Sequence, residues 1–269
     1  MSLRTSFVPL MSAAFALVLL PSLVLAQSGS RKGRPASRAS SAVMGIAVVE
    51  LFTSQGCSSC PPADAVLRQV SEVAAKSRLP VYCLSFHVDY WNRLGWTDPY
   101  SSPGFSNRQR SYAAAAGSNR VYTPQMIVGG TEEFVGSNRS KAYAAISASL
   151  KQKPASQVAL QATELRESAM SVQFRVTGLT RGQVLHVALV QTPPANSVTR
   201  GENSGETLSH INVVRDFKTV PLNTDSGTVQ LRFPAGVTRS QTSVIAYVQN
   251  PNTLRITGAS ALPSKAFGF

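Results

Sequence analysis

Gly56-Cys57-Ser58-Ser59-Cys60-Pro61-Pro62 is the stretch that decides the fold, because it places two cysteines between a strand-like run and a helix-like run. Residues 46–52 are nearly all apolar and rich in β-branched side chains, which is typical of a strand buried on both faces. Residues 63–78 carry apolar side chains at helical spacing on one face. Two cysteines at a strand-to-helix turn are what thiol–disulfide exchange needs, since their sulfurs can bond and helix amides can stabilise a thiolate.

The first residues predict export. Arg4 precedes an apolar run, and the small residues of 24–26 suit cleavage before Gln27, so residues 1–26 are interpreted as a cleavable signal peptide. The apolar run is shorter than the ~20 residues that span a membrane, and we therefore expect no transmembrane segment after cleavage. A secreted or periplasmic chain meets oxidising conditions, in which a disulfide persists.

The strongly basic composition, with a net charge of +13 at pH 7, invites a nucleic-acid-binding interpretation. Part of the excess lies in residues 27–42, which are rich in Ser, Gly and Arg and predict a disordered basic linker. The remaining basic residues are scattered rather than clustered with aromatic ones. Solubility and weak attraction to acidic envelope surfaces explain this pattern better than specific nucleic-acid binding.

The chain up to residue 153 predicts the order strand, helix, strand, helix, strand, strand, helix. The expected bounds are 46–52, 63–78, 81–88, 105–116, 125–128, 131–135 and 139–151. The first three elements form a parallel strand–helix–strand unit. Gly129-Gly130 suits a tight hairpin turn between the two short strands.

Beyond Lys153-Pro154 the pattern changes to short alternating runs separated by Gly, Pro, Asn and Ser. These runs cover residues 158–165, 170–176, 183–191, 208–220, 227–233 and 242–249. Such a rhythm predicts a mainly antiparallel, β-sandwich-like module. We therefore expect an α/β domain over residues 43–153, followed by a β-rich C-terminal domain over residues 154–269.

The order of the first half resembles the thioredoxin fold, with Cys-x-x-Cys after the first strand and Thr123-Pro124 before the hairpin. More narrowly, residues 50–64, 86–91 and 123–125 are similar to the secreted thioredoxin-like family catalogued as domain of unknown function 1223. The similarity extends into residues 201–203 and 212–215 and so covers most of the mature chain. It implies a thioredoxin-like domain over residues 43–153, but it brings little established activity.

Cys57 and Cys60 are the first candidate site residues. A bridge between them closes a very small loop and removes little entropy from the unfolded chain, so a purely structural role explains the pair poorly. The resemblance implies that Cys57 is the nucleophile and that Cys60 resolves the mixed disulfide. It also implies that Pro124 is cis and that Thr123 lends backbone hydrogen bonds to a substrate chain. No cofactor is expected beyond the redox-active Cys57–Cys60 disulfide.

Two further features lie beside the cysteines. Pro61 suits the first turn of a helix, which predicts that the helix begins there with Cys60 as its N-cap. Glu50 is an acid within an apolar strand, which is costly unless the carboxylate is paired or functional. The resemblance implies that Glu50 is the proton acceptor for the Cys60 thiol and lies beneath the disulfide. The alternative is a carboxylate bonded to a neighbouring lysine or backbone amide.

Cys83 and His87 alternate with apolar residues and point to the same face of their strand. A buried free cysteine behaves as a small hydrophobic residue, which is the favoured interpretation of Cys83. His87 stands at the carboxyl end of a parallel strand, where α/β sheets place their sites. It could orient a tryptophan, pair with Asp89, or bind a metal together with the cysteine pair.

Three functions remain open from the sequence. The leading hypothesis is an exported thiol–disulfide oxidoreductase that acts on protein thiols or disulfides, or with a redox partner, in the cell envelope. The second is a metal-binding or metallochaperone module that uses Cys57, Cys60 and His87. The third is a redox-inert envelope adaptor that presents its β-rich half to a partner.

Overall fold

The elements predicted for the first half form in the predicted order in the computed structural model, which describes residues 44–267. They are β1 (Ala47–Thr53), α1 (Pro61–Ser77), β2 (Val81–His87), α2 (Pro103–Ala115), β3 (Gln125–Val128), β4 (Glu132–Val135) and α3 (Arg139–Leu150), with a 3-10 turn η1 (Asn92–Leu94) before α2. The predicted signal peptide and basic linker, residues 1–42, lie outside the described residues. Among the described residues, no helix is long and apolar enough to cross a membrane.

Helix α1 begins at Pro61, as predicted, with Cys60 as its N-cap. Proline suits this position because its fixed φ matches the helix and the N–H that it lacks would have no partner there. Cys60 itself has helical backbone angles, φ −79° and ψ −38°, although a residue before proline usually avoids them. The cysteine is therefore continuous with the first turn of α1, and its side chain follows the helical spacing.

The second half of the chain is almost entirely strands. They are β5 (Gln157–Leu165), β6 (Ala169–Thr177), β7 (Val184–Gln191), β8 (Asn196–Ser197), β9 (Thr207–Leu208), β10 (Val213–Pro221), β11 (Ser226–Arg232), β12 (Thr242–Gln249) and β13 (Ile256–Pro263), with 3-10 turns η2 (Arg239–Gln241) and η3 (Ser264–Phe267). The strands differ from the sequence prediction in two ways. The run predicted over residues 208–220 divides into β9 and β10, and neither β8 nor β13 was predicted.

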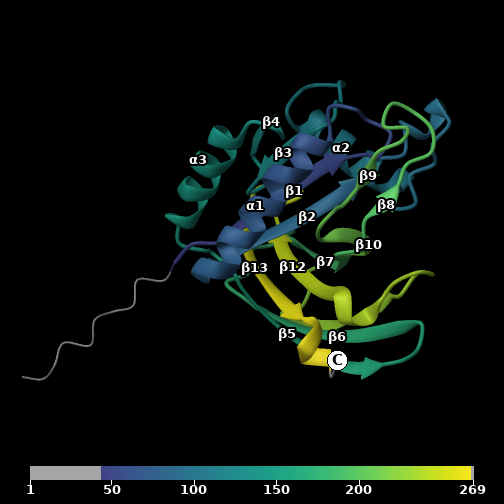
Figure 1. The fold of residues 1–269 in the computed structure, drawn as a ribbon. Coiled ribbons are helices and arrows are strands. Elements are labelled where there is room, and N and C mark those ends of the chain that lie inside the picture. The colour runs from purple at the N-terminus through teal and green to yellow at the C-terminus, as the bar shows by residue number, and fades with distance from the viewer. Residues whose placement is uncertain (1–43, 268–269) are drawn as a thin grey trace, which may run out of the picture. The chain divides into compact units, whose positions relative to one another are not determined.

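One sheet connects the two halves (Figure 1). Its eight strands have the order β13-β12-β7-β10-β2-β1-β3-β4. β1 pairs in parallel with β2, and β10 joins β2 through a single pair, Val213 with Ser85. The predicted boundary between residues 153 and 154 therefore falls inside one compact unit, to which all the described residues belong.

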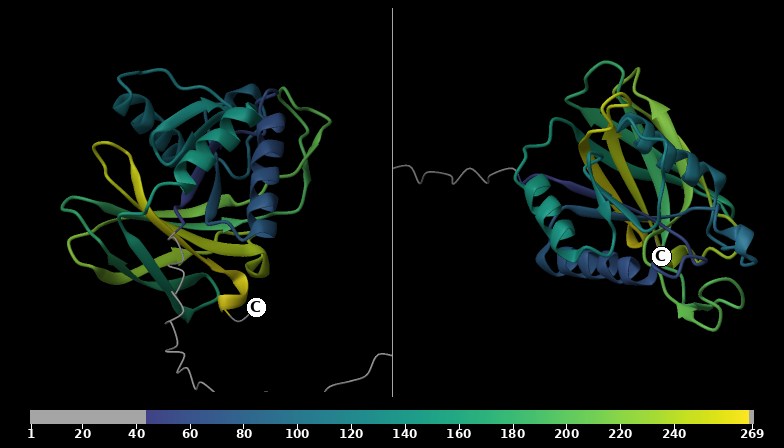
Figure 2. Two further views of the ribbon diagram at one scale, coloured as in Figure 1. Left: turned by 90° about the vertical axis from the view of Figure 1, so that its left-hand side faces the viewer. Right: turned by 90° about the horizontal axis from the view of Figure 1, so that it is seen from above.

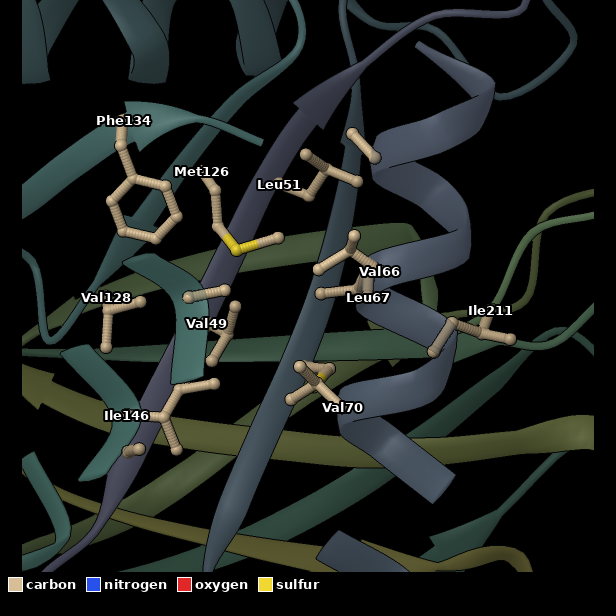
Figure 3. Close-up of a cluster of buried hydrophobic side chains, with 14 residues drawn as sticks. Val49, Leu51, Val66, Leu67, Val70, Met126, Val128, Phe134, Ile146 and Ile211 are labelled. Carbon is tan, nitrogen blue, oxygen red and sulfur yellow. The ribbon is translucent and has the colours of Figure 1, made fainter. Parts of the chain in front are cut away.

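The two faces of β1 bury different cores, which explains why all seven of its residues are buried. Val49 and Leu51 face α1 and α3, where Leu67 and Ile146 complete a mainly aliphatic core (Figure 3). Phe52, on the opposite face, packs in a second core with side chains of β7 and β12, among them Tyr247. The second half of the sheet therefore lies over the face of β1 that α1 leaves free (Figure 2).

A separate three-stranded sheet, β11-β6-β5, forms the outer layer. Its apolar side chains pack against the far face of β7 and β12 in a third core. The fold is thus mixed α/β. Helices α1 and α3 cover one face of β1, α2 packs in the core on its other face, and the remaining layers are mainly antiparallel strands. The carboxyl ends of β1 and β2 lie side by side, with Thr53 in register with His87, and this edge carries the cysteine pair.

Candidate functional site

The cysteine pair is a disulfide in the turn that joins β1 to α1. Both cysteines are completely buried, whereas Ser58 and Ser59 between them are exposed. The turn is held locally, since the Cys60 N–H donates to the Cys57 carbonyl at 3.1 Å and the Ser59 hydroxyl lies 3.4 Å from the Cys57 sulfur. The site therefore presents a closed disulfide with two polar residues on its outer side.

Thr123 lies beside Cys57, and Pro124 follows it in the chain. Their peptide bond is cis, as predicted, and the Thr123 hydroxyl lies 3.3 Å from Cys57 Sγ. The indole N–H of Trp91 donates to the same hydroxyl oxygen at 2.7 Å. Because the indole is a donor only, the Thr123 hydrogen is free to point at the sulfur. Thr123 thus reaches the site with its side chain, a contact that the sequence did not predict.

A distant segment fastens the cysteine turn. The side-chain amide of Asn203 donates to the carbonyls of Gln55 and Cys57, at 2.9 and 3.0 Å. The Glu202 carboxylate accepts from the Ser58 N–H at 2.9 Å and from its hydroxyl at 2.8 Å. These two donors hold the pKa of Glu202 below its usual range, so the carboxylate is ionised. Residues 201–203 are called the clamp segment below.

Asp64 is a buried acid in the first turn of α1, the helix that Cys60 caps. It lies four residues after Cys60, one turn along α1, and is 7% exposed. The Thr53 hydroxyl donates to its carboxylate at 3.2 Å, and His210 Nδ1 lies 3.5 Å from the other oxygen. Arg68, one turn further, binds the carbonyl of Ser209. This face of α1 therefore looks onto the segment that carries His210, and residues four apart on a helix lie on one face.

The orientation of Gln55 fixes the proton on His210. The Gln55 carbonyl oxygen accepts from the Trp96 indole at 3.1 Å, so its amide nitrogen is the atom 3.2 Å from His210 Nε2. An amide nitrogen donates only, and Nε2 must therefore be an acceptor. With Nε2 as the acceptor, the ring hydrogen lies on Nδ1, the nitrogen that is 3.5 Å from the Asp64 carboxylate. This separation is long, and Nδ1 makes no hydrogen bond among the described contacts.

His87 pairs with Asp98. Pairing with Asp89, one of the predicted alternatives, is not found, because the chain after β2 turns so that the later acid meets the ring. Its Nδ1 lies 2.7 Å from the Asp98 carboxylate, and both side chains are buried. Burial opposes ionisation of Asp98, but His87 and the N–H groups of Gln55 and Tyr100 outweigh it and hold the pKa of Asp98 below its usual range. Asp89 instead binds the Ser106 hydroxyl.

The metal alternative finds no support in the arrangement. Across residues 44–267, no group of three or more His, Cys, Asp or Glu side chains is placed to hold a metal ion. Cys57 and Cys60 are joined to one another, and His87 faces Asp98 and packs edge-on against His210, with ring centres 4.6 Å apart. The three proposed ligands therefore do not form a cluster.

Glu50 is not placed beneath the disulfide, contrary to the prediction that it serves Cys60. As an even-numbered residue of β1, it shares a face with Phe52 and points away from α1. Arg108 binds both its carboxylate oxygens, at 2.8 and 3.1 Å, and the hydroxyls of Tyr112 and Tyr247 donate to it as well. The alternative prediction, a paired carboxylate, agrees better with the structure, although the partner is Arg108 of α2 and not a lysine or a backbone amide.

Arg108 lies at the centre of this buried group, between the two halves of the sheet. Its guanidinium lies 5.0–5.7 Å from the centres of four aromatic rings. Burial alone would lower the pKa of Arg108, but the Glu50 carboxylate and the tyrosine hydroxyls raise it above its ordinary value. The charges of Glu50 and Arg108 thus neutralise one another inside the core, which is a structural role.

Cys83 is a buried free cysteine, as predicted. Burial raises the pKa of its thiol to about 12, so the thiolate is scarce at neutral pH. Cys83 packs in the core between β1 and α1 and does not take part in the site.

The residues that sequence reasoning missed come from far along the chain. Asn203 and His210 lie more than 140 residues from their partners in the cysteine turn. The resemblance did extend into residues 201–203, which is the signal that could have found Glu202 and Asn203. Asp64 stood inside the quoted motif, but nothing in the periodicity of α1 separated it from an ordinary first-turn acid.

The chain is similar to protein AGR_C_4864 from Agrobacterium tumefaciens, with 30% identity and a TM-score of 0.61 to its crystal structure over 82% of this chain and 95% of that one. A domain of the outer membrane lipoprotein Omp28 from Porphyromonas gingivalis gives 10% identity and a TM-score of 0.27 over 41% of this chain and 88% of its own. Comparison with curated proteins gives no match.

The family match covers most of the chain. Residues 48–249 match the family described as Protein of unknown function (DUF1223). This range includes the cysteine turn, Thr123-Pro124, the clamp segment and His210. The chain therefore belongs to the DUF1223 family.

Proposed function

We propose that this protein is a thiol–disulfide oxidoreductase with a thioredoxin-like site, in which Cys57 is the nucleophile. The observation that carries the proposal is the Cys57–Cys60 disulfide at the start of α1, with the Thr123 hydroxyl 3.3 Å from the Cys57 sulfur. A hydroxyl donor beside Cys57 would stabilise its thiolate once the disulfide is reduced.

The reaction has two exchange steps. In the reduced protein, the Cys57 thiolate attacks one sulfur of a substrate disulfide, and the other substrate sulfur leaves as a thiolate. Cys60 then loses its proton and attacks the Cys57 sulfur of the mixed disulfide. The second substrate sulfur leaves, and the Cys57–Cys60 bond is restored. Two electrons pass to the substrate, and the reverse sequence oxidises a dithiol.

The second step requires an acceptor for the Cys60 proton. Asp64 suits this role, because it lies one turn from Cys60 on the same face of α1, and the Thr53 hydroxyl and His210 flank its carboxylate. Glu50 is engaged by Arg108 on the other face of β1. We therefore assign the acceptor role to Asp64 in place of Glu50.

An exported location belongs to the same proposal. The predicted signal peptide would deliver the chain to an oxidising compartment, where the disulfide form is maintained and protein thiols or disulfides are available. The cell envelope is the expected place of action.

The proposal is tested by reduction of a protein disulfide in vitro. Purified protein should accelerate the reduction of insulin by dithiothreitol, and Cys57→Ala should abolish the acceleration. Reduced Cys60→Ala should form a covalent adduct with an insulin chain, detected by mass spectrometry and released by reductant, because Cys57 attacks but nothing resolves the adduct. If the protein neither accelerates insulin reduction nor forms an adduct, the proposal is contradicted and the redox-inert adaptor is favoured.

A further inference from the structure

The disulfide is closed off from solvent. Cys57 and Cys60 have no exposed surface, although Ser58 and Ser59 between them are exposed. A thiolate must reach a sulfur atom directly, because exchange passes through a mixed disulfide formed at that atom. Groups around the cysteine turn therefore have to move before exchange can begin.

The clamp segment binds the backbone of the turn from the second half of the chain, whereas Asn196 and His210 of the same half bind the Gln55 side chain. Asn203 and Glu202 together engage three backbone groups of the turn, the carbonyls of Gln55 and Cys57 and the N–H of Ser58. Asn203 is itself buried at 6% exposure. Two adjacent side chains thus hold one turn of backbone across a separation of 144 to 148 residues.

The hairpin that carries the clamp segment has little structure of its own. β8 and β9 contribute two residues each and form a separate two-stranded sheet, which lies beside the start of α1 (Figure 2, left). Gly201 and Gly205 adopt positive φ angles of 78° and 90° within its loop. Short elements with few backbone pairs open at a lower free energy than core strands.

We propose that Asn203 and Glu202 are positioning residues that hold the Cys57–Ser58 turn closed, and that a polypeptide substrate reaches Cys57 by replacing their hydrogen bonds. Release of the clamp segment leaves two carbonyls and one N–H of the turn without partners. The main chain of an extended peptide offers N–H and C=O groups that satisfy all three. A small thiol compound offers fewer such groups, so the chemistry selects a peptide that carries the reacting sulfur. This role rests on the proposed function.

The closure itself is tested with a reductant. We expect the rate of Cys57–Cys60 reduction by excess dithiothreitol to rise about fivefold to thirtyfold in Asn203→Ala, because the loss of two buried hydrogen bonds raises the free energy of the closed form. Glu202→Gln keeps the size of the side chain and should give a smaller rise. The matched control is Ser204→Ala. Among the described contacts, the Ser204 hydroxyl bonds only to the Thr199 carbonyl, which belongs to the same hairpin.

Equal reduction rates in the wild type, Asn203→Ala and Glu202→Gln would overturn the closure. Thermal unfolding of each variant checks that a faster reduction comes from the folded protein, and amide exchange of Ser58 should accelerate in Glu202→Gln. This test does not depend on catalysis. If the Cys57–Cys60 disulfide is reduced faster in Asn203→Ala but the wild type does not accelerate insulin reduction, the role of the clamp segment is supported and the proposed function is contradicted.

The substrate class is tested with two disulfides. Reduced wild-type protein should react faster with a glutathione-blocked cysteine inside a ten-residue peptide than with glutathione disulfide, and Asn203→Ala should narrow this preference. An equal rate for both disulfides in the wild type would contradict selection of a peptide main chain.

Discussion

The hydroxyl of Thr123 lies 3.3 Å from the Cys57 sulfur, although 66 residues separate the two in the chain. Trp91 donates to the Thr123 oxygen, which leaves the hydroxyl hydrogen for the sulfur. The loop before β3 therefore places a hydrogen-bond donor beside Cys57, the partner of Cys60 in the disulfide. In the reduced protein the same hydroxyl meets a sulfur that ionises, and a donor favours the thiolate.

Replacing Thr123 by Val removes this donor while it keeps the shape of the side chain. We expect the pKa of Cys57 in the reduced protein to rise, and its alkylation by iodoacetamide at pH 7 to slow by about tenfold or more, since a hydrogen bond to a charged group contributes about 1.5–3 kcal/mol. The absorbance of the thiolate, followed against pH, gives the pKa directly. Thr123→Ser retains the hydroxyl and is the control; an unchanged titration in Thr123→Val would show that the hydroxyl does not bind the thiolate.

Asp64→Asn tests the acceptor of the Cys60 proton. Reduced protein mixed with 5,5′-dithiobis(2-nitrobenzoate) releases one coloured thiolate when Cys57 attacks and a second when Cys60 resolves the adduct. We expect the second release to slow by about tenfold or more and the first to change less than about twofold, because general-base assistance serves only the second step. Stopped-flow absorbance separates the two releases.

The same variant alters the pH profile of the second step. Without the acceptor, resolution follows the ionisation of the Cys60 thiol itself, and its rate should climb with pH toward ~8.5. Equal slowing of both releases would indicate that Asp64 only supports the structure of the turn.

Breaking the ion pair between Glu50 and Arg108 should lower the stability of the protein and leave the thiol–disulfide exchange steps unchanged. Glu50→Gln leaves the Arg108 charge buried without its carboxylate, which costs about 3–5 kcal/mol in comparable ion pairs. Urea unfolding should show this loss, and the ratio of the two thiolate releases should match that of the wild type. Glu164→Gln, which breaks an exposed pair with Arg166, is the control and should change stability by less than about 1 kcal/mol. A selective slowing of the second release in Glu50→Gln would restore the predicted role of Glu50.

The local features of the first half were predictable because neighbouring residues determine them. The helix start at Pro61, the turn at Gly129-Gly130 and the element order follow from proline chemistry, glycine and periodicity. The cis bond at Pro124 needed the resemblance as well, since position alone does not select the isomer. The face of Glu50 was not predictable, because β1 is buried on both sides and gives no alternation that marks the face of α1.

Contacts between the halves escaped prediction for a different reason. Glu202, Asn203 and His210 reach the cysteine turn through the long connection between β7 and β10, and that path depends on the single pair that joins β10 to β2. No local pattern encodes it. β13 was missed since Gly258 and the small residues after it weaken the strand signal, although the Gly258 position leaves no room for a side chain against the Ser156 backbone.

The junction between the halves also predicts acid sensitivity. His186 lies in the core beside Phe217, with Nε2 2.8 Å from Gln249 Oε1 and Nδ1 2.9 Å from the Thr219 hydroxyl. Burial and the charge of Arg108 lower the pKa of His186 from 6.5 to about 3, and the hydrogen bond to Gln249 only partly opposes them. The folded protein therefore keeps this imidazole neutral at pH values where the unfolded chain has protonated it.

The sign follows from proton binding. Between pH 6.5 and about 3 the unfolded state binds more protons at His186, so the free energy of unfolding falls as pH falls, by about 1.4 kcal/mol for each pH unit. His186→Gln removes the group that titrates. In urea unfolding between pH 7.5 and pH 4, we expect the free energy of unfolding to fall less steeply with falling pH for the variant than for the wild type. The stability advantage of the wild type should therefore shrink steadily below pH 6.5. Parallel curves for the two proteins would mean that His186 is protonated alike in both states, and that Arg108 does not hold it neutral.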